Sequence, residues 1–217
     1  SASLSNGIFN VFSSFPAPLS PSCINNLESL LQRINSFERD MNQLHNHPAS
    51  PTVPLLSLVA DARRLADGTL SFIYKLRGDP AQLLIPPAHD NARRDGLWQH
   101  TCFEAFIAVQ GETAYREFNF SPSGQWAAYA FSTYRQAEES VLSLTPPVII
   151  SNLSAGGFVL SALLAPDALP TDSRQRPLRV GLCAVIESRD TLGYWALHHA
   201  TERPDFHHPE SFTLILP

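Results

Sequence analysis

The chain has 217 residues, of which 44% are hydrophobic and 16% are charged, and its formal net charge is -5 with a pI near 5.9. This length is sufficient for one well-buried core and too short for two ordinary domains, and the acidic balance argues against nucleic acid as the main partner. No stretch approaches the roughly 18 consecutive apolar residues that a membrane-spanning helix requires, so a membrane is not an expected partner either.

The first 41 residues are predicted to be an N-terminal extension outside the domain core, either poorly ordered or helical. Residues 1–22 are rich in Ser and Pro and lack a secretory signal, which favours a cytoplasmic location. Residues 23–40 carry apolar side chains at helical spacing, namely Leu27, Leu30, Leu31 and Ile34. Met41 is the only methionine, and a natural start there is a hypothesis that N-terminal sequencing of the native protein would test.

Residues 42–217 are predicted to form one β-rich domain. The segment 42–54 contains three prolines and is expected to be an extended lead-in. Two alternating runs follow, and Asp67-Gly68 between them indicates a hairpin turn. Later strands are expected at 148–153, 158–164, 179–188, 193–198 and 212–216. Many short strands with few helices favour a sandwich or a barrel over βαβ units.

Two runs in the middle of the chain, 97–109 and 115–134, contain the most informative residues. Alternation along a strand places Trp98, His100, Cys102, Glu104 and Phe106 on one face of the first run. In the second run, Phe118 and Phe120 are expected to face the core. Glu117 and Asn119 then point outward or line a cleft. The turn at residues 121–124 implies a returning strand that begins at Trp126.

Four segments of the chain resemble a bacterial group of DOMON-like domains, which are relatives of the family 9 carbohydrate-binding modules. The segments are DGLWQHTCFEAF (95–106), YREFNFSPSGQW (115–126), Tyr134-Arg135 and PDFHHP (204–209). The resemblance extends from about residue 45 to the C-terminus and excludes residues 1–40. It implies an antiparallel β-sandwich of the immunoglobulin-like or jelly-roll type, with a concave face for a small ligand, typically a sugar or haem.

The candidate ligand-binding residues combine aromatic rings with carboxylate, amide and basic groups: Trp98, His100, Glu104, Glu117, Asn119, Trp126 and Arg135. Such a set suits a sugar, because a ring packs on its C–H face while fixed donors and acceptors bind its hydroxyls.

Structural roles for the same residues remain open. Either tryptophan can belong to the core, and His100 can be a hydrogen-bonded packing residue. Glu104 can form a buried ion pair with Arg116 or Arg135. Asn119 can cap the turn that follows it.

No cofactor is predicted, and haem is the alternative. Cys23, Cys102 and Cys183 show no CxxC spacing, so a thiolate zinc site or a disulfide framework is not predicted, and the last two are expected to be small core residues. The paired histidines 198–199 and 207–208 lack a metal-ligand spacing. Haem is an alternative cofactor, held by His100 and one of these pairs.

The predicted function is a non-catalytic module that binds a carbohydrate or a similar polar small molecule. A haem- or metal-binding redox or sensor domain is one alternative, and a protein-interaction module is another. Glycosidase chemistry through Glu104 and Glu117 is a third, since glycosidases use two carboxylates. No nucleophile elbow, phosphate-binding loop or dinucleotide motif is present in the sequence.

Overall fold

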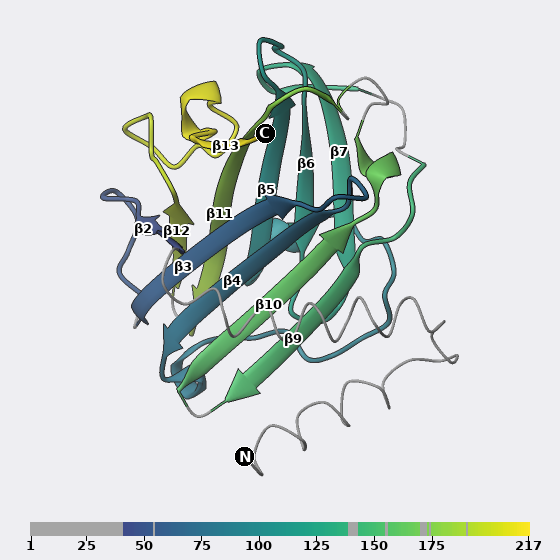
Figure 1. The fold of residues 1–217 in the computed structure, drawn as a ribbon. Helices are drawn as coiled ribbons and strands as arrows, with labels where there is room; N and C mark the ends of the chain where they lie inside the picture. Colours follow the sequence, from purple (N-terminus) through teal and green to yellow (C-terminus); the bar gives the residue numbers. More distant parts are fainter. Residues whose placement is uncertain are drawn as a thin grey trace. The chain divides into compact units, whose positions relative to one another are not determined.

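Two antiparallel β-sheets make up the described part of the protein in a computed structural model (Figure 1). The structure describes residues 41–217 except 54, 139–142, 155, 170–172, 174 and 190. The first sheet has the order β1 (Asn42–Gln43), β3 (Leu55–Arg64), β4 (Leu70–Gly78), β10 (Gly157–Leu164) and β9 (Val148–Ser154). The predicted all-β class is confirmed, whereas residues 1–40 of the predicted extension lie outside the described residues.

The second sheet is larger and carries the residues of interest for function. Its order is β2 (His45–Asn46), β12 (Thr191–Ala196), β11 (Leu178–Ser188), β5 (Cys102–Val109), β6 (Tyr115–Phe120), β7 (Trp126–Thr133) and β8 (Gln136–Ala137), and β13 (Leu214–Leu216) pairs with β11. Short 3-10 helices connect the strands: η2 (Pro80–Gln82), η3 (Leu97–Gln99), η4 (Pro166–Ala168) and η6 (Pro209–Ser211). None of the helical segments that the structure describes is long and apolar enough to cross a membrane.

The main core lies between the two sheets, and alternation along each strand supplies it. Phe72 of β4 packs against Phe120 of β6, with ring centroids 5.7 Å apart. Tyr74 of β4 packs against Phe103 of β5 at 5.1 Å. The Tyr74 hydroxyl also donates a hydrogen bond of 2.7 Å to the backbone carbonyl of Glu104. Figure 1 shows the strands of the first sheet lying across those of the second.

A second apolar cluster covers the opposite face of the larger sheet, which is called the outer face below. Phe106 and Phe131 project from the sheet, and Phe206 and Phe212 pack onto them from the C-terminal segment (residues 197–213). Gly181 of β11 makes this approach feasible, because a Cβ at that position would lie 2.8 Å from the Phe212 ring. The larger sheet is therefore apolar on both faces, and the outer face is only partly covered.

The structure shortens one expected strand and adds others. The run 97–109 is a strand only from Cys102 onward, since Gly96 at φ 78° turns the chain into the 3-10 helix η3. The last predicted strand begins at Leu214. The expected lead-in at 42–54 contains the two-residue strands β1 and β2. The hairpin at Asp67-Gly68 is confirmed, and Gly68 has a φ of 85°.

Candidate ligand-binding pocket

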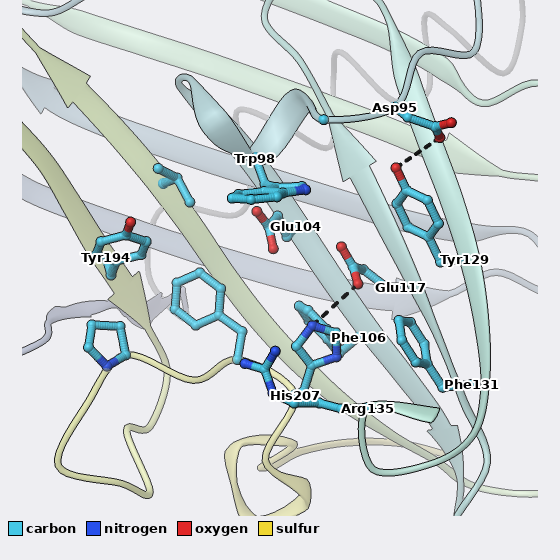
Figure 2. Close-up of a pocket in the computed structure, with 14 residues that line it drawn as sticks. Asp95, Trp98, Glu104, Phe106, Glu117, Tyr129, Phe131, Arg135, Tyr194 and His207 are labelled. Carbon is cyan, nitrogen blue, oxygen red and sulfur yellow. Dashed lines mark hydrogen bonds and ion pairs between the residues drawn. The ribbon is translucent and has the colours of Figure 1, made fainter. Parts of the chain in front are cut away.

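A cavity of about 560 Å³ opens on the outer face of the larger sheet (Figure 2). Strands β5, β6, β7, β11 and β12 supply its floor and one side. Helix η3, the turn after β7 and the C-terminal segment supply its rim. The lining residues are Asp95, Gly96, Trp98, Glu104, Phe106, Glu117, Tyr129, Phe131, Arg135, Val185, Tyr194, Pro204, Phe206 and His207.

Two buried glutamates form the polar part of the floor and are called the carboxylate pair below. The antiparallel register places Glu104 opposite Asn119 and Phe106 opposite Glu117, so the two glutamates are diagonal neighbours on one face. Glu104 is 2% exposed and Glu117 is 5% exposed. Asn119 donates a hydrogen bond of 2.6 Å to Oε1 of Glu117. Oε1 of Glu104 has no hydrogen-bond partner among the described residues.

Burial controls the ionisation of this floor. Loss of hydration raises the pKa of Glu117 to about 7, although the Asn119 hydrogen bond and the charge of Arg135 lower it. Burial, and then the charge of Glu117, raise the pKa of Glu104 well above its ordinary value. Burial lowers the pKa of His207 to about 4, so this imidazole is neutral at pH 7. The empty pocket therefore retains protons on the carboxylate pair near neutrality.

Arg135 joins the sheet to the C-terminal segment at one side of the rim. It is a non-glycine residue in the left-handed region, with a φ of 55°, in the turn between β7 and β8. Its guanidinium forms an ion pair of 2.8 Å with Asp205, and its backbone N–H donates to the Tyr115 hydroxyl at 3.1 Å. Tyr134 also donates to Asp205. These contacts stabilise a conformation that is unfavourable for most residues.

Aromatic rings surround the carboxylate pair. Trp98 lies on η3 and is 50% exposed, and Figure 2 shows its ring beside the Glu104 carboxylate. Tyr129 stands opposite Glu117 in the β6–β7 register, and its hydroxyl donates a hydrogen bond of 2.9 Å to the Asp95 carboxylate. Tyr194 lies on the far side of the cavity, on β12. A large, half-exposed indole ring next to a buried carboxyl group is typical of a ligand site and unusual for a structural surface.

The pocket contains four of the seven predicted site residues: Trp98, Glu104, Glu117 and Arg135. Asn119 lies beneath the surface as a support for Glu117 and does not line the cavity. The alternative in which Glu104 forms a buried ion pair is wrong for both partners. Arg116 donates to the Ala168 carbonyl on the other face, and Arg135 pairs with Asp205.

Two predicted contacts lie elsewhere. Trp126 was expected as a second binding platform, but it is opposite Phe120 in the register and belongs to the core between the sheets. His100 was expected to share the face of Glu104. Helix η3 precedes His100 and replaces the expected strand there. The His100 imidazole lies 3.0 Å from the Glu187 carboxylate, outside the cavity.

Several lining residues were missed by the sequence analysis. Tyr129 and Phe131 follow the alternation that places Glu117 outward, and their register partners are Glu117 and Tyr115. That signal was present in the sequence once the turn at 121–124 was recognised. Phe206 and His207 reach the pocket through the packing of the C-terminal segment, which local patterns do not encode.

The described residues offer few ligands for a metal ion or for haem near this cavity. Within the described ranges, no three His, Cys, Asp or Glu side chains are grouped so that they could hold a metal ion. Of the histidines named for a bis-histidine haem site, only His207 lines the cavity. Cys102 and Cys183 are buried free thiols, as predicted.

Comparisons with known proteins concern the fold. No family model and no curated protein matches the chain. A protein of Bacteroides uniformis ATCC 8492 that is proposed to bind carbohydrate is similar over 87% of this chain and 90% of its own, with a TM-score of 0.61 and 16% identity. A family 9 carbohydrate-binding module of Caldicellulosiruptor kristjanssonii in complex with glucose is similar over 82% of each chain, with a TM-score of 0.50 and 10% identity.

At such low sequence identity, these similarities establish the fold alone. The chain adopts a fold like that of the family 9 carbohydrate-binding modules, which agrees with that part of the predicted resemblance. The closer resemblance to DOMON-like domains stays a prediction.

Proposed function

We propose that the protein is a non-catalytic module that binds a small carbohydrate, or a polar ligand of similar size, in this pocket. The observation that supports this most is the half-exposed ring of Trp98 beside a buried carboxylate oxygen, Oε1 of Glu104, that has no partner among the described residues. A sugar offers the complement of this arrangement, since its C–H face packs on a ring and its hydroxyls donate to acceptors.

The size of the pocket and the fold support the same ligand class. A cavity of about 560 Å³ lies within the range of small-molecule sites in proteins. One protein of similar fold is proposed to bind carbohydrate, and the other is in complex with glucose. Fold alone does not determine function, so the proposal depends on the residues of this chain.

The position of the carboxylate pair argues for binding without catalysis. Glycosidases hold two carboxylates on opposite sides of the scissile bond. Here Glu104 and Glu117 lie side by side on neighbouring strands, on the same floor. A sugar above them would meet both groups from the floor of the pocket, where they can accept hydrogen bonds from its hydroxyls.

Replacing Trp98 by alanine is expected to weaken sugar binding by roughly three- to tenfold, which corresponds to the loss of one aromatic stacking contact. The melting temperature should change little, because the ring is already half exposed. Isothermal titration calorimetry against a panel of mono- and disaccharides measures the affinity.

Leu153→Ala serves as the control for this experiment. Leu153 is a 58% exposed apolar side chain on β9 of the other sheet and should not affect affinity. Equal affinities of the wild type and Trp98→Ala would exclude the ring as a contact. If no sugar in the panel binds at millimolar concentration, the proposal that the ligand is a carbohydrate is wrong.

A further inference from the structure

We propose that the ligand of this pocket carries a protonated amine, so that an amino sugar binds in preference to the corresponding neutral sugar. This inference rests on the proposed function and specifies the chemical class of its ligand. It follows from the charges around the carboxylate pair, from the free carboxylate oxygen and from the aromatic lining.

The ionisable groups that line the pocket are predominantly acidic, and they become negatively charged when they lose their protons. Glu104, Glu117 and Asp95 all contribute carboxyl groups. The one guanidinium among the lining residues, that of Arg135, is already paired with Asp205. His207 is neutral at pH 7 because burial lowers its pKa to about 4. No cation of the described residues therefore forms an ion pair with Glu104. Glu117 lies 3.7 Å from the neutral His207 imidazole, and only the charge of Arg135, which is shared with Asp205, favours its ionised form.

Glu104 lines the cavity, and one oxygen of its carboxyl group has no hydrogen-bond donor among the described residues. The groups that reach the Glu104 backbone are the Tyr74 hydroxyl, at 2.7 Å, and the Cys183 thiol, at 3.9 Å, and both contact its carbonyl oxygen. Asn119 donates to Glu117 instead. Oε1 of Glu104 has no donor from any described residue although it is fully buried. A buried acceptor without a partner is costly, and a donor on the ligand would remove that cost.

An ammonium group fits this position better than a hydroxyl. It donates three hydrogen bonds and can reach both carboxylates, whereas a hydroxyl donates one. Its charge also offsets the repulsion between two carboxylates, and this attraction is strong where water is excluded. Asparagine or glutamine side chains could accept hydrogen bonds from a neutral sugar hydroxyl, and burying them costs less desolvation free energy than burying two acids. The chain uses two acids here, which indicates a cationic partner.

The aromatic lining favours the same ligand. The rings of Trp98, Tyr129, Tyr194 and Phe206 line the cavity around the carboxylate pair. The faces of such rings attract cations, and the attraction grows when the cation is desolvated. A ring of an amino sugar would therefore contact aromatic side chains while its ammonium group lies over the carboxylates.

Binding of a cation should also depend on pH, because it requires ionised carboxylates. Raising the pH through the titration of Glu117 increases the negative charge of the floor and should strengthen binding of an amine that stays protonated. The other titratable groups near the pair are Tyr74, Cys102, Tyr115, Tyr129, Arg135, Cys183 and His207, together with Asp95, which accepts a hydrogen bond from Tyr129. The thiols and phenols keep their protons near neutrality, because burial raises the pKa of each of them.

Calorimetry on the full chain tests the inference with sugars that differ at one substituent. The probes are glucose, N-acetylglucosamine and the 2-amino, 3-amino and 6-amino deoxy derivatives of glucose, at pH 5.5 and pH 7. We expect at least one amino sugar to bind about tenfold more tightly than glucose at pH 7, a difference of about 1.4 kcal/mol. The ratio should be smaller at pH 5.5, and N-acetylglucosamine should lose the advantage because its amide is uncharged.

Variants assign the effect to the carboxylate pair. Glu104→Gln and Glu117→Gln keep the shape of the floor, and each should bring the ratio between amino sugar and glucose close to one. Glu112→Gln removes the same charge from an exposed ion pair with Arg176 and should leave the ratio unchanged. Melting temperatures of all three variants establish that the proteins are folded.

The outcomes separate this inference from the proposed function. Equal affinity for glucose and for every amino sugar, with measurable binding of glucose, would overturn the amine preference and leave carbohydrate binding intact. A preference that persists in Glu104→Gln and Glu117→Gln would overturn the assignment to the carboxylate pair. Binding of none of the sugars would overturn both.

Discussion

Replacing Gly157 by alanine is expected to lower the free energy of unfolding by roughly 3 kcal/mol or more, within the range of severe single substitutions. Gly157 begins β10 and lies opposite Arg77 of β4. A Cβ on Gly157 would lie 2.1 Å from the carbonyl oxygen of Leu76, a backbone atom that cannot move without disturbing the strand pairing. The φ of Gly157 is 154°, a value that L-residues rarely adopt.

Chemical denaturation of the wild type and the variant measures this effect, and thermal melting should show a decrease of roughly 6 to 12 °C for a domain of this size. The neighbouring Gly156 provides the control, because an added Cβ there would meet nothing within 4 Å. Gly156→Ala should therefore be close to neutral. Similar losses of stability in both variants would mean that the clash with Leu76 is not responsible.

Replacing Glu117 by glutamine is expected to stabilise the ligand-free protein by roughly 3 kcal/mol at pH 8, since each unit of pKa shift corresponds to about 1.4 kcal/mol. The folded protein raises the pKa of this carboxyl from 4.5 to about 7. An acid with a raised pKa binds more protons in the folded state, so its ionisation destabilises the fold as the pH rises between the two values. The variant has no such ionisation at this position, and the neighbouring Glu104 loses a repelling charge.

Urea denaturation of both proteins from pH 5 to pH 8 tests this prediction. The stability difference should be small near pH 5 and should grow until the pH exceeds about 7, where Glu117 is ionised. His207 acts in the opposite direction, because its lowered pKa makes stability rise with pH between about 4 and 6.5. This contribution is common to both proteins and cancels in the difference. A variant that is less stable at pH 8 would show that the ionised carboxylate is favourably paired.

A stabilising substitution at a pocket residue would support a binding role. Replacing a residue with a structural role normally destabilises the protein. Replacing a group that binds a ligand can instead stabilise the ligand-free protein. Ionised Glu117 and Glu104 lower the free energy of unfolding when the pocket is empty, because burial removes their hydration. Binding of a suitable ligand would offset that cost.

The sequence determined the two-sheet class and the polar part of the floor. Alternation alone placed Phe118 and Phe120 in the core and Glu117 outward or in a cleft, because a buried sheet fixes which side of each strand is apolar. It also put Glu104 on one face of its own strand, and the pairing of the two strands then brought it beside Glu117. This inference needs only the period of the strand and the identity of its core residues.

Alternation failed where the chain leaves the strand or where the register is set by a distant turn. Gly96 directs residues 97–99 into a 3-10 helix. His100 therefore does not share the face of Glu104, whereas Trp98 reaches the pocket from the helix and not from a strand. Trp126 faces the core because the turn at 121–124 pairs it with Phe120. The contribution of Phe206 depends on how the C-terminal segment packs over the outer face, and this packing involves contacts far apart in the sequence.

The hydrogen bond from Tyr74 to the Glu104 backbone has a consequence for the rate of binding. It links the first sheet to the strand beneath the pocket, and Tyr74 itself is fully buried. The backbone of the floor is thereby fixed from both sides before a ligand arrives, so no rearrangement of that strand needs to precede association. The observed rate should rise in proportion to ligand concentration in a single phase, without the plateau that a slow conformational step produces.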